Sequence, residues 1–351
     1  MITEEQQELV AAVRGAVARS GGPAVDRGAL ESELGYDAAL WRTLCEQVGV
    51  AALAIPEEYG GFGASLVESL LVVGELGRSL AGVPMLGSAV LGAQAVLLSG
   101  DSEACDRLLP EVAEGVRTIA LCWAGPGGWD GFGVRAERET LNGTAHYVLD
   151  AVDAETLIVV TATGLFEVDP SASGVERRAS ATMDPTRKLG EITFTDVTGR
   201  KLGTADPAPI IARLREIAWA ALAAEQVGAA EQCLEMTVEY AKSRVQFGRP
   251  IGSFQALKHR MADMYVLVES AKSTSYAATI AVGTESPSSA EDVWVARRHC
   301  SQAYSTVAAE MIQLHGGIAI TWEHDAHLHF KRAHGDALLF GTPHRPLGRS
   351  A

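Results

Sequence analysis

The 351-residue sequence has few cysteines, no long apolar run and no excess of positive charge. Its cysteines lack C-x-x-C spacing, which argues against disulfide staples and a cysteine metal site and favours free thiols in a reducing compartment: Cys45, Cys105, Cys122, Cys233 and Cys300. No stretch of about 18 apolar residues is present, as a membrane-spanning helix would require. With the polar, acidic start of the chain, this predicts a cytoplasmic protein without a signal peptide. The net charge of −15 disfavours a nucleic-acid or anionic-membrane partner.

What is present changes in character along the chain. Residues 1–115 are rich in Ala, Leu and Glu at helical spacing, with one helix predicted over Ser65–Leu80 and others starting near Ser88 and Ser102, the last serving as an N-cap. Residues 116–205 contain short β-branched runs separated by turn residues, for example Leu141-Asn142-Gly143, which predicts a small antiparallel β domain.

Residues 206–351 return to helical patterning. Four long helices are expected, broken at 248–252 and at Gly316-Gly317, over residues 210–245, 253–283, 289–315 and 323–340. Helices, then a β module, then a helical bundle is not the order of a doubly wound α/β fold. The predicted fold class is mostly α with a central β domain.

Two blocks carry the clearest chemistry. The first is Arg244-Val245-Gln246-Phe247-Gly248-Arg249-Pro250, and the second is Gln313-Leu314-His315-Gly316-Gly317. The Arg244 guanidinium can hold an anion through two hydrogen bonds. Phe247 offers an apolar face to a planar ring, and Gln246 offers a hydrogen bond. The alternative is structural: Arg244 caps a helix and Phe247 fills an interhelical core.

Four ordered blocks resemble the acyl-CoA dehydrogenase family. They span about 270 residues: Ile55–Gly63, Glu75–Leu80, Tyr240–Gln255 with Ala262-Asp263-Met264, and Gln313–Trp322. The resemblance implies a helical N-domain, a middle β-barrel domain and a C-terminal four-helix bundle. It also implies FAD as the cofactor, bound across a subunit boundary by residues that reach a neighbouring subunit's flavin: Arg244, Gln246, Phe247, Gly248, Gln255, Gln313, Gly316 and Gly317.

The family's catalytic base is missing in this sequence. That base is a carboxylate that removes the α-proton of an acyl thioester, and it occupies one of two positions. At the first, 23 residues past Gly317 and before Gly341-Thr342, this chain has Phe340; at the second it has Ala218. Glu225 lies seven residues beyond Ala218 on the same helix face and could be a displaced base or a polar interface residue. No catalytic residue is therefore expected, with Glu225 the one candidate.

The middle domain also departs from the family pattern. Tyr147-Val148-Leu149 stands where the family has Trp-Ile-Thr against the flavin ring, so a hydroxyl at the flavin edge becomes Leu149. Trp123 and Trp129 could fill the vacated ring cavity or be ordinary core residues. Elsewhere, His324-Asp325-Ala326-His327-Leu328-His329 has metal-capable spacing, but a solvated helix face is the favoured interpretation and no metal site is predicted.

These departures resemble the non-catalytic subunit of actinobacterial α2β2 acyl-CoA dehydrogenases. The resemblance implies a homologous partner that supplies the glutamate, an acyl-CoA substrate such as a sterol side-chain thioester, and electron-transfer flavoprotein as acceptor. Two alternatives stay open: a non-redox acyl-CoA- or nucleotide-binding or scaffold homo-oligomer of the same fold, and a homo-oligomeric dehydrogenase that uses Glu225.

Overall fold

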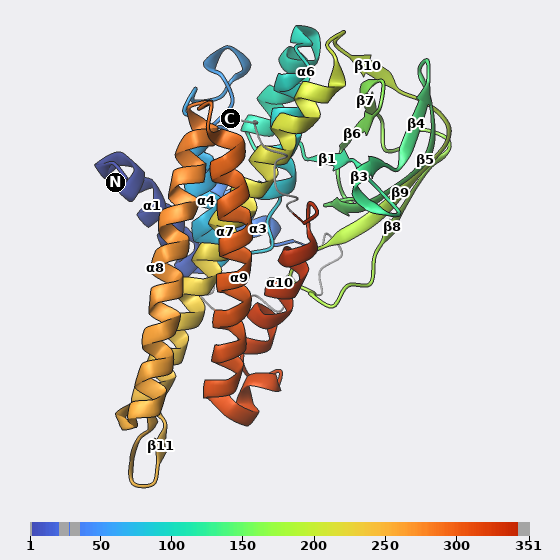
Figure 1. Ribbon diagram of the computed structural model, residues 1–351. Coiled ribbons are helices and arrows are strands. Elements are labelled where there is room, and N and C mark those ends of the chain that lie inside the picture. Colours follow the sequence, from blue (N-terminus) through green and yellow to red (C-terminus); the bar gives the residue numbers. More distant parts are fainter. Residues whose placement is uncertain (1, 21–27, 29–35, 343–351) are drawn as a thin grey trace, which may run out of the picture.

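A computed structural model describes residues 2–20, 28 and 36–342 of the chain (Figure 1). The N-terminal part is helical, with short 3-10 or π segments η1 and η2: α1 (Glu4–Ser20), α3 (Ala38–Gln47), η1 (Glu57–Tyr59), α4 (Leu66–Arg78), η2 (Met85–Gly92), α5 (Ala93–Leu98) and α6 (Ser102–Ala113). The helix predicted from Ser65 is confirmed: Ser65 and Glu68 form a capping box at the start of α4. The predicted N-cap Ser102 is wrong. Asp101 caps α6, because its carboxylate accepts from the Ala104 amide at 2.9 Å.

The middle part is a β domain of two packed sheets with a shared apolar core. One sheet has the order β1-β6-β7-β10 and the other β4-β5-β9-β8; the strands are β1 (Ile119–Cys122), β4 (Val134–Glu137), β5 (Thr140–Leu149), β6 (Thr156–Thr161), β7 (Gly164–Val168), β8 (Val175–Ala179), β9 (Leu189–Thr198) and β10 (Arg200–Leu202). A separate hairpin joins β2 (Ala124–Gly125) to β3 (Gly128–Phe132).

Two details of the predicted β domain need correction. The domain is not purely antiparallel, since β1 and β6 pair in parallel. Asn142-Gly143 is not a turn either: both residues lie inside β5, where the register against β9 shifts between Leu141 and Gly143. Gly143, with φ of 131°, adopts there a conformation that other residues rarely take.

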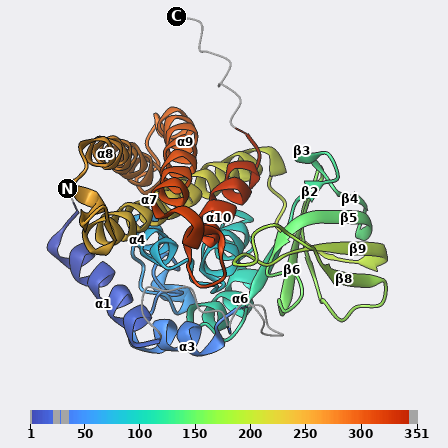
Figure 2. The same cartoon turned by 90° about the horizontal axis from the view of Figure 1, so that it is seen from below.

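The C-terminal part is a bundle of four helices, as the sequence predicts. They are α7 (Pro207–Ser243), α8 (Gln255–Gly283), α9 (Ser289–His315) and α10 (Ala326–Leu338), with η3 (Ile251–Ser253) and η4 (Gly316–Ile320) at the junctions. Figure 2 shows the β domain on one side of this bundle. No described helix is both long and apolar enough to span a bilayer.

The α7–α8 connection projects beyond the bundle as a hairpin (Figure 1). Its strands are β11 (Val245–Gln246) and β12 (Arg249–Pro250). The two residues at the turn, Phe247 and Gly248, have φ of 54° and 76°, as a type I′ turn requires.

The N-terminal helices reach the bundle through a close backbone approach of α4 to α7. A Cβ added at Gly228 of α7 would lie 1.8 Å from the Gly74 carbonyl oxygen, and one added at Gly77 would lie 2.4 Å from the Glu225 carbonyl oxygen. Only glycine lets the two backbones pack this closely.

Substituting Gly228→Ala should therefore destabilise the protein. We expect a loss of about 2 kcal/mol in the free energy of unfolding, because the helices must separate to admit the methyl group. Gly127→Ala is the matched control, since nothing lies within 4 Å of its added Cβ. Urea denaturation of both variants checks the prediction, and equal midpoints would contradict it.

Candidate functional site

An aromatic cluster lies between the β domain and the C-terminal helices. The ring centroid of Trp129 is 4.8 Å from that of Phe340 and 5.8 Å from that of Trp123, and it stacks with Tyr147 at 6.3 Å. Trp123, Trp129 and Phe340 are all buried. One cluster thus contains both tryptophans, Tyr147 and Phe340, the residue at the first expected base position.

Almost no space remains among these rings. The cavity there has a volume of about 10 Å³ and is lined by Gly87, Leu91, Leu121, Trp129, Tyr147, Leu149 and Phe340. A single water molecule needs a space of that order. A tricyclic flavin ring does not fit unless Trp129 and Phe340 move.

Hydrogen bonds from α7 and α9 fix the aromatic cluster. Arg215 donates to the Trp129 carbonyl oxygen at 2.7 Å, and the Trp219 indole donates to the Phe340 carbonyl oxygen at 2.9 Å. Arg297 is almost fully buried, and its Nη2 lies within hydrogen-bonding distance, 3.0–3.3 Å, of four carbonyl oxygens, those of Asp336, Ala337, Leu339 and Gly341. These hydrogen bonds fix the backbone on both sides of Phe340, so its ring has a defined position in the cavity.

The two other residues considered as bases lie on α7. Ala218 is fully buried and has no titratable group. Glu225 is 5% exposed and forms ion pairs with both Arg187 and Arg332. Burial alone raises the pKa of Glu225, but the two guanidinium groups outweigh it and the pKa is lowered. A carboxylate held in this way is a poor proton acceptor at neutral pH.

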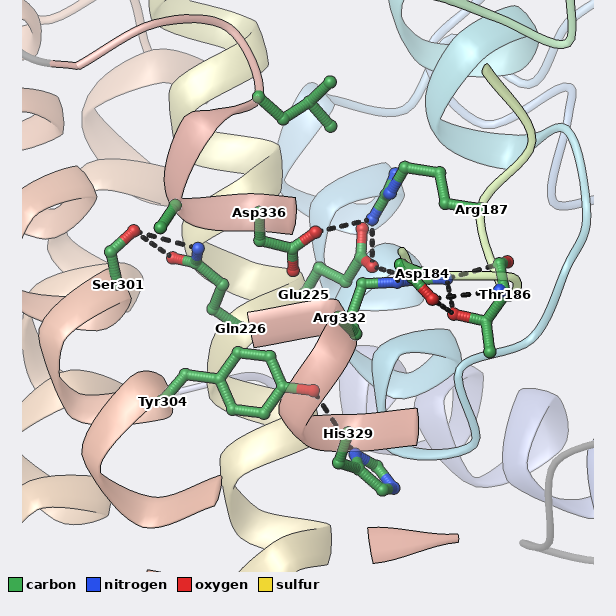
Figure 3. A network of polar contacts seen from close by, with 12 residues as sticks. Asp184, Thr186, Arg187, Glu225, Gln226, Ser301, Tyr304, His329, Arg332 and Asp336 are labelled. Carbon is green, nitrogen blue, oxygen red and sulfur yellow. Dashed lines mark hydrogen bonds and ion pairs between the residues drawn. The ribbon is translucent and has the colours of Figure 1, made fainter. Parts of the chain in front are cut away.

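Glu225 belongs to a larger buried network, shown in Figure 3. Arg332 of α10 also donates to Asp184 at 2.7 Å and to the Thr186 hydroxyl at 2.6 Å. Arg187 contacts Asp336 of α10 at 3.2 Å. Asp184, Thr186 and Arg187 come from the segment between β8 and β9, so the network joins the β domain to α7 and α10.

These arginines are the site residues that sequence reasoning missed. Arg187, Arg297 and Arg332 lie in no recognisable sequence motif. The partners of Arg332 are separated from it by 107 to 148 residues, so no local pattern reveals the pairing.

The expected solvated face of residues 324–329 is wrong. His327 and His329 are buried, and the His329 ring lies 3.3 Å from the Tyr304 hydroxyl. Burial lowers the pKa of His329 to about 3, and the neighbouring Arg332 adds to that effect. Among the residues that the structure describes, no group of histidine, cysteine or acidic side chains could hold a metal ion.

The residues that the sequence assigns to a neighbour's flavin lie at one end of the bundle. Arg244 is the C-cap residue of α7, as the structural alternative allowed. Phe247 is 91% exposed, so it fills no interhelical core. Gln246, Gly248, Gln255, Gln313, Gly316 and Gly317 are exposed as well. This group lies apart from the buried aromatic cluster.

Comparison with known proteins identifies the class. The acyl-CoA dehydrogenase N-terminal domain matches residues 3–116, and the C-terminal domain matches residues 217–345. The chain belongs to the acyl-CoA dehydrogenase family. It is 46% identical over 348 residues to acyl-CoA dehydrogenase IpdE2 of Mycobacterium tuberculosis, covering 99% of this chain and 96% of that protein. Acyl-CoA dehydrogenase IpdE2 of Mycolicibacterium smegmatis is 43% identical, and the match covers 99% of this chain and 98% of that protein.

Solved structures agree with this assignment. A chain of the ChsE4–ChsE5 complex from Mycobacterium tuberculosis superposes with a TM-score of 0.89 at 29% identity, covering 97% of this chain and 95% of that one. The Tcur3481–Tcur3483 steroid ACAD matches with a TM-score of 0.87 at 29% identity, with 97% and 94% covered. The family resemblance and the predicted fold class are confirmed.

FAD is the cofactor of this family. The residues described above suit one half of the FAD molecule and not the other. The exposed arginine, aromatic and glycine residues around Arg244 suit a dinucleotide's adenine and pyrophosphate. The packed cluster around Trp129 does not suit the flavin ring.

Titration of Asp336 gives a testable pH dependence. Burial raises the pKa of Asp336 to about 7, Glu225 adds to this rise, and Arg187 opposes it. Between its ordinary pKa of 3.8 and about 7, the folded protein therefore holds a proton that the unfolded chain has released, so this group makes stability fall as pH rises. Between pH 5 and pH 7 this group should lower the free energy of unfolding by about 2 kcal/mol, and Asp336→Asn should abolish that decrease.

The measurement is the free energy of unfolding in urea at pH 5, 6, 7 and 8 for both proteins. Other titrating groups are common to both, so the difference in slope isolates Asp336. Parallel pH profiles would show that Asp336 ionises normally in the folded protein.

Proposed function

We propose that this chain is one subunit of a hetero-oligomeric FAD-dependent acyl-CoA dehydrogenase that introduces a double bond between the α and β carbons of an acyl-CoA. In this assembly the chain supplies flavin contacts to a homologous partner, and the partner supplies the glutamate base. The observation that carries the proposal is the filled cavity around Trp129 and Phe340, in a chain whose projecting hairpin keeps an exposed Arg244 and Phe247.

Each exposed residue has a defined part in this proposal. When bound, FAD would supply the acceptor for the hydride of the acyl β-carbon. Arg244 neutralises and orients the pyrophosphate, and Phe247 covers one face of the adenine. Gln246, Gln255 and Gln313 offer amide hydrogen bonds. Gly248, Gly316 and Gly317 leave room for a close ligand, since an added Cβ at any of them would meet nothing within 4 Å, although the Gly316 amide itself already donates to the Ile312 carbonyl oxygen.

The substrate and partner classes follow from the relatives. One solved relative is part of a two-protein complex, and another is described as a steroid ACAD. We therefore propose a homologous acyl-CoA dehydrogenase chain as partner, an α2β2 assembly and a CoA thioester of a steroid-derived acid as substrate. Electron-transfer flavoprotein is the proposed electron acceptor.

Two other functions receive less support. A scaffold gives no reason for Phe247 to be 91% exposed beside an arginine at the tip of a hairpin. A non-redox nucleotide-binding homo-oligomer could use the same residues, and the flavin content of the co-purified pair distinguishes it from the proposed function. A homo-oligomeric dehydrogenase would need Glu225 as its base, but Arg187 and Arg332 hold that carboxylate ionised within the domain junction.

Flavin content tests the proposal directly. We expect the chain purified alone to contain no flavin, and the chain co-purified with a homologous partner that carries the missing glutamate to contain about one FAD per pair of unlike chains. Visible absorbance after denaturation gives the ratio. One FAD per chain in the isolated protein would overturn the proposal, because the flavin ring would then occupy the cavity that Trp129 fills.

In that complex, Arg244→Met should lower the FAD content, since the pyrophosphate loses its guanidinium. Lys242→Met is the matched control: Lys242 is equally cationic, lies two residues away and pairs with Glu239 within α7.

Substituting Glu225→Gln separates the proposed role from direct catalysis. Turnover per bound FAD in the assembled enzyme should stay within about twofold of the wild type, because the proposed base belongs to the partner; loss of a true base typically costs 10²-fold or more. Stability should fall, since two buried arginines lose an anion. A collapse of turnover with flavin and assembly intact would identify Glu225 as the base.

A further inference from the structure

His315 lies between the two blocks that are proposed to contact the flavin. It is the last residue of α9, two residues after Gln313 and directly before Gly316-Gly317. Its side chain is 4% exposed, although the glycines beside it are exposed. Its Nδ1 lies 2.8 Å from the Met311 carbonyl oxygen. Because a carbonyl can only accept, Nδ1 carries the hydrogen, and a neutral ring then has an unprotonated Nε2.

The imidazole of His315 stacks on Tyr240 of α7. The ring centroids are 4.4 Å apart and the planes are inclined by 26°. Tyr240 lies one helical turn before Arg244, and its carbonyl oxygen accepts from the Arg244 amide at 2.8 Å. Within the α7–α9 interface, this ring contact joins the end of α9, where Gly316-Gly317 begins, to the end of α7, where the hairpin begins.

The other neighbour of His315 is His324, which precedes α10. Their ring centroids are 4.5 Å apart. The Nδ1 of His324 accepts from the Ala326 amide at 3.1 Å, at the first turn of α10. His315 therefore contacts both the α7 end and the start of α10.

We propose that His315 is a positioning residue for FAD. Its neutral imidazole fixes the chain at Arg244, where α7 ends, relative to the chain at Gly316-Gly317, where α9 ends. The inference rests on the function proposed above, and it concerns how this chain holds its two cofactor-contacting segments in register. Arg244 and Gly317 are 73 residues apart in sequence, so their spacing depends on a tertiary contact of this kind.

Neutrality follows from the surroundings of the ring. Among the described residues, Nε2 of His315 has no hydrogen-bond partner and no solvent contact. A proton there would be a buried donor with nothing to accept it. The titratable groups that face the ring are Tyr240 from α7 and His324 from the segment before α10. Burial, with His324 adding to it, lowers the pKa of His315 below its ordinary 6.5.

The sign of the pH dependence follows. Because the folded site disfavours the proton, its stability is complete above pH 6.5 and declines as pH falls below that value. We therefore expect FAD affinity to weaken in the same direction, as the two segments lose their common support.

The experiment measures FAD dissociation from the co-purified complex by the fluorescence of released flavin, at pH 8 and pH 5.5. His315→Ala should weaken FAD roughly three- to tenfold at pH 8, the worth of an aromatic contact. His315→Phe keeps a ring against Tyr240 but cannot titrate, so it should bind FAD as the wild type does at pH 8 and lose less affinity at pH 5.5.

His334→Ala is the matched control. Its Nδ1 bonds the carbonyl oxygen four residues earlier at 2.9 Å, and its ring contacts Phe330, the same arrangement on an exposed face of α10. If His315→Ala behaves like His334→Ala while Arg244→Met weakens FAD, the positioning role is wrong and the proposed function stands. If Arg244→Met also has no effect, both are wrong.

Amide hydrogen exchange provides a readout that needs no flavin. In His315→Ala, the Arg244 amide should exchange faster together with Gly316 and Gly317, because the two segments are coupled. Faster exchange at Gly316-Gly317 alone would overturn the coupling, even if overall stability had changed.

Discussion

The buried ion network around Glu225 is the constraint on which the docking of the β domain against the C-terminal bundle depends. Two arginines and three carboxylates, drawn from the β8–β9 segment, α7 and α10, meet where the β domain contacts the bundle (Figure 3). Such a network adds little net stability, but leaving one member unpaired is costly. It therefore specifies how the domains dock more than how firmly they fold. Arg297 extends the same principle by holding the 336–341 segment through its carbonyl oxygens.

From this junction the molecule divides into a closed end and an open end. At the closed end, the aromatic rings near Leu149 leave a cavity of only about 10 Å³ between them. At the open end, glycines and an exposed phenylalanine remain without a packed neighbour on their outer side. Neither end on its own has all the residues that would bind a whole flavin. This arrangement is chemically reasonable if a second chain of the same fold supplies the missing residues, as in the function that we propose.

Much of the fold could be predicted from the sequence, because helical periodicity and glycine breaks are local signals. The limits of α7, α8 and α9 differ by only a few residues from those expected. Details set by tertiary context could not be predicted: Asn142-Gly143 is a turn signal, yet pairing with β9 keeps it inside a strand. Likewise His327 and His329 look polar in sequence but are buried. The prediction that Phe340 stands where the family has a carboxylate rests on register alone, whereas the partners of Glu225 lie in distant segments.

The projecting hairpin also affects the distribution of charge. Residues 242–260 contain five lysines and arginines and no acidic residue, in a chain whose net charge is −15. Two of these five pair with carboxylates outside the segment, Lys242 with Glu239 and Arg260 with Glu310, and the hairpin that carries Arg249 lies at the end of the bundle (Figure 1). If the proposed partner presents an acidic surface to this hairpin, the encounter is oriented and faster than for a uniformly acidic protein, and it slows as ionic strength rises. The rate of the proposed assembly would then be set partly by residues that contribute little to the folded core.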